Sequence, residues 1–145
     1  MHKLIGEYMI KQYMDKDYTI IRTSWLYGHH KEKSFVHKVA NKINKAILDG
    51  KKSIEWQANA NFSMPTNVDD LCTMIYNAIR FNIEGTCHGC GGFKDNCDVV
   101  SSFEFANAVL SAMKRANNAK YDSFTIEPVD IAASGMAYPG FSRML

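Results

Sequence analysis

The segment Thr23-Ser24-Trp25-Leu26-Tyr27 carries hydroxyl, indole and phenol side chains in close succession. A β-branched run at residues 18–23 leads into it and predicts a buried strand. Ligands of open α/β sheets bind beyond the carboxyl ends of the strands, where an indole can stack on a sugar ring or a base and hydroxyls can orient polar groups. The segment therefore predicts a small-molecule binding loop. The alternative is that Trp25 and Tyr27 only pack the loop onto the core.

Three cysteines and a histidine form a second candidate, because thiolates and imidazoles are zinc ligands. They are Cys87, His88, Cys90 and Cys97. Cys-x-x-Cys is half of many zinc sites, but one later cysteine is not a standard second half, which favours ordinary buried or loop thiols. A cluster of histidines is a third candidate, and it consists of His29, His30 and His37. Histidines in a polar loop are more often solvated than bound to a metal. We therefore predict no metal site, and keep a small metal-binding module as an alternative.

Motifs that would hold a nucleotide cofactor are missing from the sequence. Gly89, Gly91 and Gly92 have the wrong spacing for Gly-x-Gly-x-x-Gly, and no helix is predicted to start there. The chain also has neither a Walker loop nor a serine in a nucleophile elbow. The residues of this chain therefore form no evident motif that would bind a cofactor or a phosphate group.

The composition is that of a soluble globular protein: 145 residues, 46% hydrophobic, 22% charged, with a formal charge of +2. The weak, scattered charge gives no nucleic-acid footprint, and no apolar run is long enough to span a membrane. The N-terminus lacks the features of a secretory signal, so we expect the cytoplasm. The length fits one domain, yet a doubly wound nucleotide-cofactor enzyme needs two halves of about this size.

Alternating helix and strand patterns predict an α/β fold with short strands. Helices are expected at residues 3–14, after Ser34 as N-cap and ending at Gly50, after Asn67 as N-cap, and at 101–116 with a capping box of Ser101 and Glu104. Strands are expected at 18–23, 53–56, 85–88 and 123–126, and residues 24–33 and 57–66 are expected to be loops. Periodicity predicts two buried helix faces: Leu71, Met74, Ile75, Ala78 and Ile79, and Phe105, Val109, Ala112 and Met113.

Several segments, in order along the chain, resemble the C-terminal half of the dTDP-4-dehydrorhamnose reductases, which are extended short-chain dehydrogenases. Residues 3–7 resemble the Lys-Leu-x-Gly-Glu that ends the Tyr-x-x-x-Lys catalytic motif. Residues 22–28 resemble the signature Arg-Thr-Ser-Trp-x-Tyr-Gly almost letter for letter, and residues 61–66 resemble the loop Gln-x-Gly-x-Pro-Thr. Weaker similarities continue at residues 35–36, 70–71, 85–88, 101–106, 139 and 142.

The resemblance implies that residues 1–145 form a single partial domain. This domain would be the C-terminal, substrate-binding part of an NAD(P)-binding Rossmann-like fold, without the N-terminal dinucleotide-binding half. In this family a tyrosine donates a proton to the 4-keto oxygen of a dTDP-sugar and NADPH or NADH gives the hydride. Lys3 would then be catalytic, lowering the pKa of that tyrosine and holding the cofactor ribose, with Thr23 near the nicotinamide. The implied substrate-binding residues are Ser24, Trp25, Asn61 and Thr66.

The departures from the family pattern also set expectations. The tyrosine would precede Lys3 by four positions, ahead of Met1, and the glycine fingerprint would lie further upstream. We therefore expect this chain alone to be inactive and to bind no cofactor tightly. We also expect it to need an N-terminal Rossmann half as partner and to expose a strand edge and an apolar patch without it. A homodimer is possible. Asn61, Ser63 and Tyr138 replace Gln, Gly and Arg, which leaves the sugar nucleotide open.

A non-catalytic relative gives a further alternative. The regulatory subunit of methionine adenosyltransferase has the same fold and acts as a partner protein. The Trp25 of the Arg-Thr-Ser-Trp signature favours the reductase, whose product would be dTDP-rhamnose, a precursor of cell-surface polysaccharide.

Overall fold

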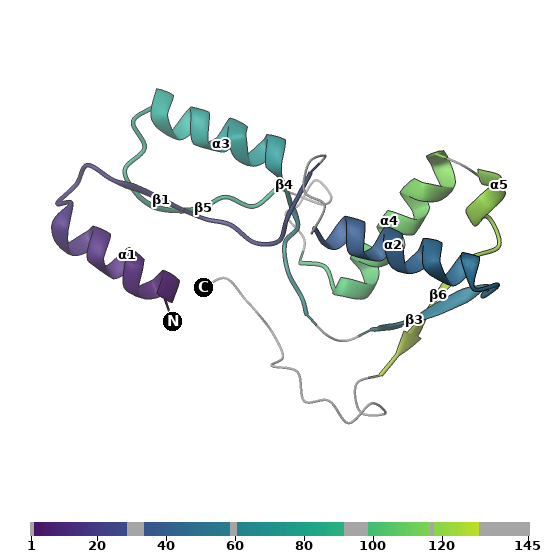
Figure 1. Cartoon of the computed structure of the whole chain (residues 1–145). Helices are drawn as coiled ribbons and strands as arrows, with labels where there is room; N and C mark the ends of the chain where they lie inside the picture. Colours follow the sequence, from purple (N-terminus) through teal and green to yellow (C-terminus); the bar gives the residue numbers. More distant parts are fainter. Residues whose placement is uncertain (1, 29–33, 59–60, 92–98, 117, 131–145) are drawn as a thin grey trace.

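The computed structural model describes residues 2–28, 34–58, 61–91, 99–116 and 118–130, which form two lobes side by side (Figure 1). The helices are α1 (His2–Tyr13), α2 (Phe35–Leu48), α3 (Val68–Arg80), α4 (Ser102–Ala116) and α5 (Asn118–Tyr121). The strands are β1 (Thr19–Arg22), β2 (Leu26–Tyr27), β3 (Ser53–Gln57), β4 (Thr66–Asn67), β5 (Gly85–His88) and β6 (Thr125–Val129). Each described helix is too short or too polar to cross a lipid bilayer.

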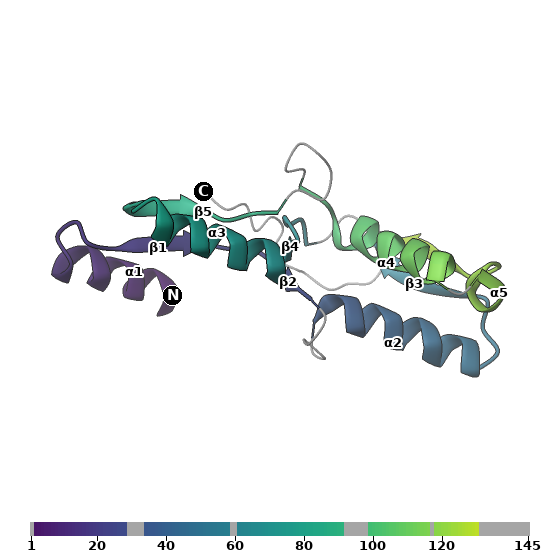
Figure 2. The same cartoon turned by 90° about the horizontal axis from the view of Figure 1, so that it is seen from above.

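Parallel pairing joins strands that are distant in the chain. In the described ranges β1 pairs with β5, β2 with β4, and β3 with β6, in three two-stranded sheets. The first lobe holds α1, β1, β5 and α3, and the second holds α2, α4, α5, β3 and β6, with the β2–β4 pair at the junction (Figure 2). This mixture of helices and parallel strands confirms the predicted α/β class. The strands β2 and β4 fall in segments predicted as loops.

The helix starts follow the predicted capping residues. The Ser34 hydroxyl accepts a hydrogen bond from the backbone N–H of His37 at 3.4 Å. The side-chain carbonyl of Asn67 accepts from the backbone N–H of Asp69 at 3.0 Å. Before α4, the backbone N–H of Ser101 donates to the Glu104 carboxylate at 2.7 Å, and the Glu104 N–H donates back to the Ser101 hydroxyl at 3.1 Å. This reciprocal pair is the predicted capping box.

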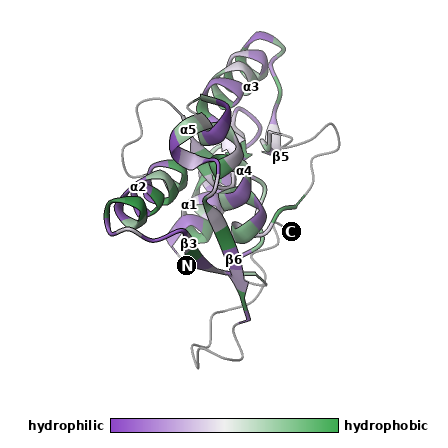
Figure 3. Ribbon diagram, turned by 90° about the vertical axis from the view of Figure 1, so that its right-hand side faces the viewer, coloured by the Kyte–Doolittle hydropathy of each residue, from purple (hydrophilic) through white to green (hydrophobic). Residues whose placement is uncertain are grey.

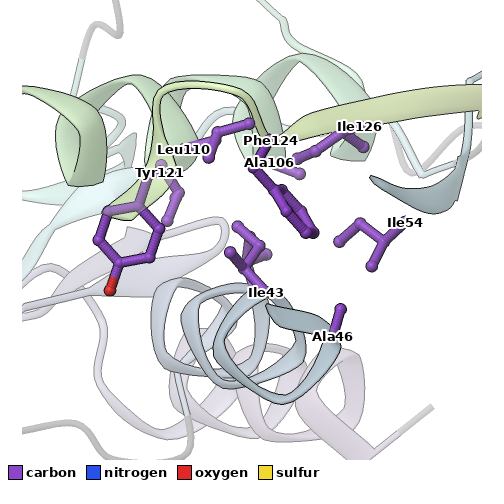
Figure 4. Close-up of a cluster of buried hydrophobic side chains, with 10 residues drawn as sticks. Ile43, Ala46, Ile54, Ala106, Leu110, Tyr121, Phe124 and Ile126 are labelled. Carbon is purple, nitrogen blue, oxygen red and sulfur yellow. The ribbon is translucent and has the colours of Figure 1, made fainter. Parts of the chain in front are cut away.

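The main hydrophobic core lies in the second lobe, between α2, α4 and the β3–β6 pair. Figure 4 shows Ile43 of α2, Ile54 of β3 and Phe124 pointing toward one another. Ile43 has no exposed surface, and the ring of Phe124 is 2% exposed. Helix α2 presents hydrophobic and hydrophilic residues on different sides (Figure 3), as expected for a helix with one buried face.

Two details of the predicted buried faces are wrong. On α3, Ile75 and Ile79 are 41% and 75% exposed, while Ala78 is buried. On α4, Ala112 is exposed, and Leu110 is buried instead. Helical periodicity groups residues on a face, but burial also requires a neighbouring element, and the two strands β1 and β5 are too narrow to cover all of α3.

Helix α1 is held against β1 by a polar contact. α1 and α3 lie on opposite sides of the β1–β5 pair (Figure 1), and α1 has no buried residue. The guanidinium of Arg22 donates to both carboxylate oxygens of Glu7, at distances from 2.7 to 3.2 Å. Helix α1 also exposes large apolar residues, among them Leu4 at 67% and Tyr8 at 63%. This is the apolar patch that the sequence led us to expect.

Glu7→Gln is expected to remove a pH-dependent part of the attachment of α1 to β1. The hydrogen bond from Arg22 is the main cause that holds the pKa of Glu7 below its ordinary value of 4.5. The ion pair therefore stabilises the folded protein fully above that ordinary value, and its contribution is lost as the pH falls through the lowered pKa. Hydrogen exchange of the α1 amides, corrected for intrinsic rates, should show protection that decreases between about pH 6 and pH 3 in the wild type.

The control is Glu84→Gln, which changes an exposed carboxylate beyond the end of α3. Glu84→Gln should keep the wild-type dependence of α1 protection on pH. Glu7→Gln should give weak protection of the α1 amides at both ends of this pH range. Equal profiles for wild type and Glu7→Gln would contradict the assigned role of this ion pair.

Candidate functional site

The candidate site is built where β1 ends and β2 begins. The loop Thr23-Ser24-Trp25 connects these strands. β2 pairs with β4, so that Leu26 lies opposite Thr66. The backbone N–H of Thr66 donates to the carbonyl of Trp25 at 2.8 Å. The predicted binding loop and the segment 61–66 are therefore adjacent, although about forty residues of sequence separate them.

Ser24 makes a side-chain link between the same two segments. Its hydroxyl is hydrogen-bonded to the hydroxyl of Ser63, and it accepts from the backbone N–H of Met64 at 3.3 Å. Ser63 is buried and forms an isolated antiparallel bridge with Val100, with both N–H to carbonyl distances at 2.9 Å. The Ser24 hydroxyl therefore fixes the position of segment 61–66 relative to the end of β1.

Thr66, which pairs with Leu26 at this junction of the two segments, is fully buried. Its hydroxyl donates to the carbonyl of Met64 at 3.3 Å and accepts from the backbone N–H of Gly91 at 3.2 Å. The Thr66 side chain thus connects the segment after β5 to the site. Substrate contact by Thr66 stays a prediction, whereas its contribution to the shape of the site follows from these contacts.

Asn61, at the start of the segment, has a left-handed backbone with φ +56°. Asparagine is among the residues that adopt this conformation most readily. The residue is partly exposed. A contact with substrate stays a prediction.

Trp25 packs by aromatic stacking. Its ring lies 5.4 Å from that of Phe35 with an interplanar angle of 13°, and Phe35 lies 5.1 Å from Phe105 with an angle of 9°. Tyr27 meets Phe105 edge-on at 5.5 Å. Both aromatic residues of the loop therefore pack toward the core, as the alternative interpretation expected. Trp25 nevertheless remains partly exposed.

The comparisons with known proteins agree with this arrangement. The model of the RmlD substrate binding domain family matches residues 1–144. The chain belongs to this family. The match confirms the family that the sequence motifs suggested and the expected substrate-binding fold. A search of curated proteins finds no match.

Two solved structures are similar to this RmlD substrate-binding domain. The dTDP-4-dehydrorhamnose reductase of Bacillus anthracis str. Ames, in complex with NADP, has a TM-score of 0.69 and 28% identity over 92% of this chain and 40% of that one. The dTDP-4-dehydrorhamnose reductase of Yersinia enterocolitica has a TM-score of 0.67 and 25% identity over 95% of this chain and 43% of that one. The chain thus spans about two fifths of these reductases.

Lys3 and Thr23 are the residues of this RmlD domain that were predicted to face a cofactor. Lys3 is exposed in the first turn of α1, four residues before Glu7. Residues at this spacing share a face of a helix. Glu7 binds Arg22, which directly precedes Thr23. The ion pair therefore links the helix face of Lys3 to the start of the binding loop. Their roles toward a cofactor stay predictions.

Tyr27 is an ionisable group of the RmlD domain that lies near the site. Burial is the main cause that raises the pKa of its phenol above the ordinary value, and the negative charge of Asp70 adds to the shift. The phenol therefore stays protonated at neutral pH. Its edge-on contact with Phe105 gives it a packing role beside the stack.

Metal binding finds no support in the described part of this RmlD domain. Among these residues, no group of three or more His, Cys, Asp or Glu side chains could hold a metal ion. Cys87 and His88 lie on β5, and the His37 ring is hydrogen-bonded to the Ser34 hydroxyl at 3.1 Å. Cys90, which follows β5, is partly exposed. Cys97, His29 and His30 lie outside the described residues.

Sequence reasoning missed several residues that shape the site of this RmlD domain. Ser63 and Gly91 act through hydrogen bonds to Ser24 and Thr66. Phe35 and Phe105 act through the ring stack. Phe105 was placed on a helix face, but Phe35 and Trp25 lie on other elements, and no local pattern could join the three rings. The family motif Phe-Val at residues 35–36 was the one available signal.

Proposed function

We propose that this chain is the substrate-binding half of an NAD(P)H-dependent reductase that converts the 4-keto sugar nucleotide dTDP-4-dehydrorhamnose to dTDP-rhamnose. The family supports this proposal, because the match covers residues 1–144 and both similar structures are dTDP-4-dehydrorhamnose reductases. The observation that carries it is the joining of the two signature segments by the hydrogen bond from Thr66 N–H to the Trp25 carbonyl at 2.8 Å. A cytoplasmic location accords with a soluble substrate of this kind.

Substrate binding is assigned to the loop after β1 and to the segment that it contacts. The exposed part of the Trp25 indole would stack on the sugar nucleotide. Ser24 and Asn61 would orient polar groups of the ligand from the two sides of the junction. Thr66, which is buried, would hold the segment in place through its bonds to Met64 and Gly91.

Lys3 and Thr23 fit a nicotinamide cofactor, NADPH or NADH, in the complete enzyme. The Lys3 ammonium is exposed on the helix that the Glu7–Arg22 pair ties to the end of β1, where the Thr23 hydroxyl lies. Ammonium and hydroxyl groups suit the ribose hydroxyls and the carboxamide of such a cofactor. When bound, the cofactor supplies the hydride for the carbonyl carbon of the sugar.

The proton for the carbonyl oxygen would come from a tyrosine one helical turn before Lys3 in the complete enzyme. A cation beside a phenol favours the phenolate and so lowers the pKa of the phenol. Lys3 would exert this effect, because residues four apart on a helix lie next to each other. Lys3 thus has two roles in the proposal: it holds the ribose and tunes the proton donor.

A Rossmann half is the partner that this proposal requires. The chain spans 40% and 43% of the two similar reductases. In the described residues, the sheet of β1 contains only β1 and β5, so β1 has a second edge that faces away from β5. The neighbouring α1 exposes Ile5 at 49% and Met9 at 52%. An adjoining parallel strand and its helices would cover this edge and these apolar side chains.

Binding of dTDP tests the proposal directly, because it needs neither cofactor nor catalysis. We expect the wild-type chain to bind dTDP in a calorimetric titration and Trp25→Ala to weaken that binding by about fivefold or more, since an aromatic stacking contact with a base contributes roughly 1–3 kcal/mol. The control Tyr76→Ala removes an aromatic residue that is 62% exposed on α3, and it should leave the dissociation constant unchanged. A wild-type chain that fails to bind dTDP would overturn the proposal.

A further inference from the structure

Three aromatic rings from separate elements form a nearly parallel stack. Trp25 of the binding loop lies against Phe35, at the start of α2, and Phe35 lies against Phe105 of α4. The ring centroids are 5.4 and 5.1 Å apart, and the interplanar angles are 13° and 9°. These separations are those of favourable aromatic pairs. The plane of the Trp25 indole therefore follows the planes of the two phenylalanine rings.

The inner end of the stack is anchored in the hydrophobic core. Phe105 is 3% exposed, and the next residue of α4, Ala106, has no exposed surface. Closely packed interiors hold side chains in defined rotamers. Phe105 thus provides a fixed surface against which Phe35 packs, and Trp25 packs in turn against Phe35.

Phe35, the middle ring, is also held from its edge. Trp56 of β3 meets it at 5.6 Å with an interplanar angle of 78°. The indole N–H of Trp56 donates to the Ser102 hydroxyl at 3.2 Å, and the ammonium of Lys42 lies 4.6 Å from the centre of the Trp56 ring. These contacts fix Trp56, and Trp56 in turn restricts the tilt of Phe35.

We infer that Phe35 is a positioning residue for sugar-nucleotide binding, which sets the plane of the Trp25 indole from the core of the second lobe. This inference rests on the proposed function. Phe35 covers one face of the indole, so a ring of the ligand has to stack on the opposite face. Without Phe35 the indole can turn, and its stacking surface is no longer preorganised for the ligand. The affinity for the ligand then falls.

Two substitutions at residue 35 and one matched control test this inference. Phe35→Leu keeps an apolar side chain but removes the flat ring, and Phe35→Tyr keeps the ring. Phe103→Leu is the control, since Phe103 is also partly buried against the core and, in the described part of the chain, takes no part in the stack. The probe is dTDP, titrated calorimetrically against the full chain, and thermal unfolding of each variant shows that it is folded.

We expect Phe35→Leu to raise the dissociation constant for dTDP by about three- to tenfold, the range that corresponds to the loss of one aromatic pair. Phe35→Tyr and Phe103→Leu should stay within about twofold of the wild type. Unchanged affinity in a folded Phe35→Leu variant, or an equal loss in Phe103→Leu, would overturn the inference.

A second measurement separates this inference from the proposed function. The chain has two tryptophans, so the ¹⁵N-labelled protein gives two indole N–H resonances, and Trp25→Phe identifies the one from Trp25. Stacked rings shift this resonance. We expect Phe35→Leu to move it toward its unfolded position and Phe103→Leu to leave it in place. If the wild type does not bind dTDP, the proposed function and the ligand role of Phe35 both fail; if dTDP binds but the resonance does not move, only the positioning inference fails.

Discussion

Ile43→Ala is expected to lower the free energy of unfolding by about 2–5 kcal/mol, the range measured when a large aliphatic side chain is truncated in a packed core. Ile43 has no exposed surface and lies at the centre of the cluster formed by α2, α4, β3 and β6. Truncation leaves a cavity that the neighbouring Phe124 ring, itself 2% exposed, has little freedom to fill. A loss of this size is a large fraction of the total stability of a small domain.

Leu48→Ala on the same helix is the matched control for Ile43. Leu48 is 84% exposed, so its truncation should change the free energy of unfolding by less than about 0.5 kcal/mol. Urea unfolding followed by tryptophan fluorescence measures both variants, because Trp56 packs against this core. Similar stability losses for the two variants would show that the second lobe is not the stable part of the chain.

Gly89→Ala is expected to lower the free energy of unfolding by about 1–3 kcal/mol, the cost of adding a methyl group to a filled space. A Cβ atom at this position would lie 2.7 Å from the Ile21 Cγ2 atom and 3.3 Å from the Met74 sulfur. Ile21 is β-branched and cannot easily turn aside. The backbone N–H of Gly89 donates to the Arg22 carbonyl at 2.8 Å, so relief of the clash would disturb the end of the β1–β5 pair, next to the binding loop.

Gly6→Ala provides the contrast for Gly89→Ala. A Cβ atom at Gly6 meets nothing within 4 Å, and the residue lies inside α1, where alanine is favoured over glycine by up to about 1 kcal/mol. We expect this substitution to leave stability unchanged or to raise it. The same unfolding measurements apply, and a loss for Gly6→Ala equal to that for Gly89→Ala would show that the close approach of Ile21 is not the cause.

The parts of the fold that depend on neighbours in the sequence were predictable. Ser34, Asn67 and the Ser101–Glu104 box cap their helices through bonds that span two or three residues. Such bonds can be inferred from the local sequence alone. Gly50, with φ +72°, follows the end of α2 as expected for the same reason.

The parts that depend on distant partners were not predictable. The two-residue strands β2 and β4 exist only because they pair with each other. Ile79 has the helical spacing of a buried residue but is 75% exposed, because no described element covers it. In the site, a family motif assigned roles to Ser24 and Thr66 from the sequence. It assigned none to Ser63 and Gly91, whose roles arise from contacts between separate segments.

The pairing of β3 with β6 has a consequence for biosynthesis. β3 ends at Gln57 and β6 begins at Thr125, so β4, α3, β5, α4 and α5 must all leave the ribosome before the pair can form. Helices form within about a microsecond, whereas translation adds about 5–20 residues per second. The apolar side of α2 packs against β3, which follows at once, and against α4. It thus waits for several seconds, on the order of the time needed to translate the chain up to α4, before this second neighbour arrives. During this interval the apolar side of α2 is only partly covered.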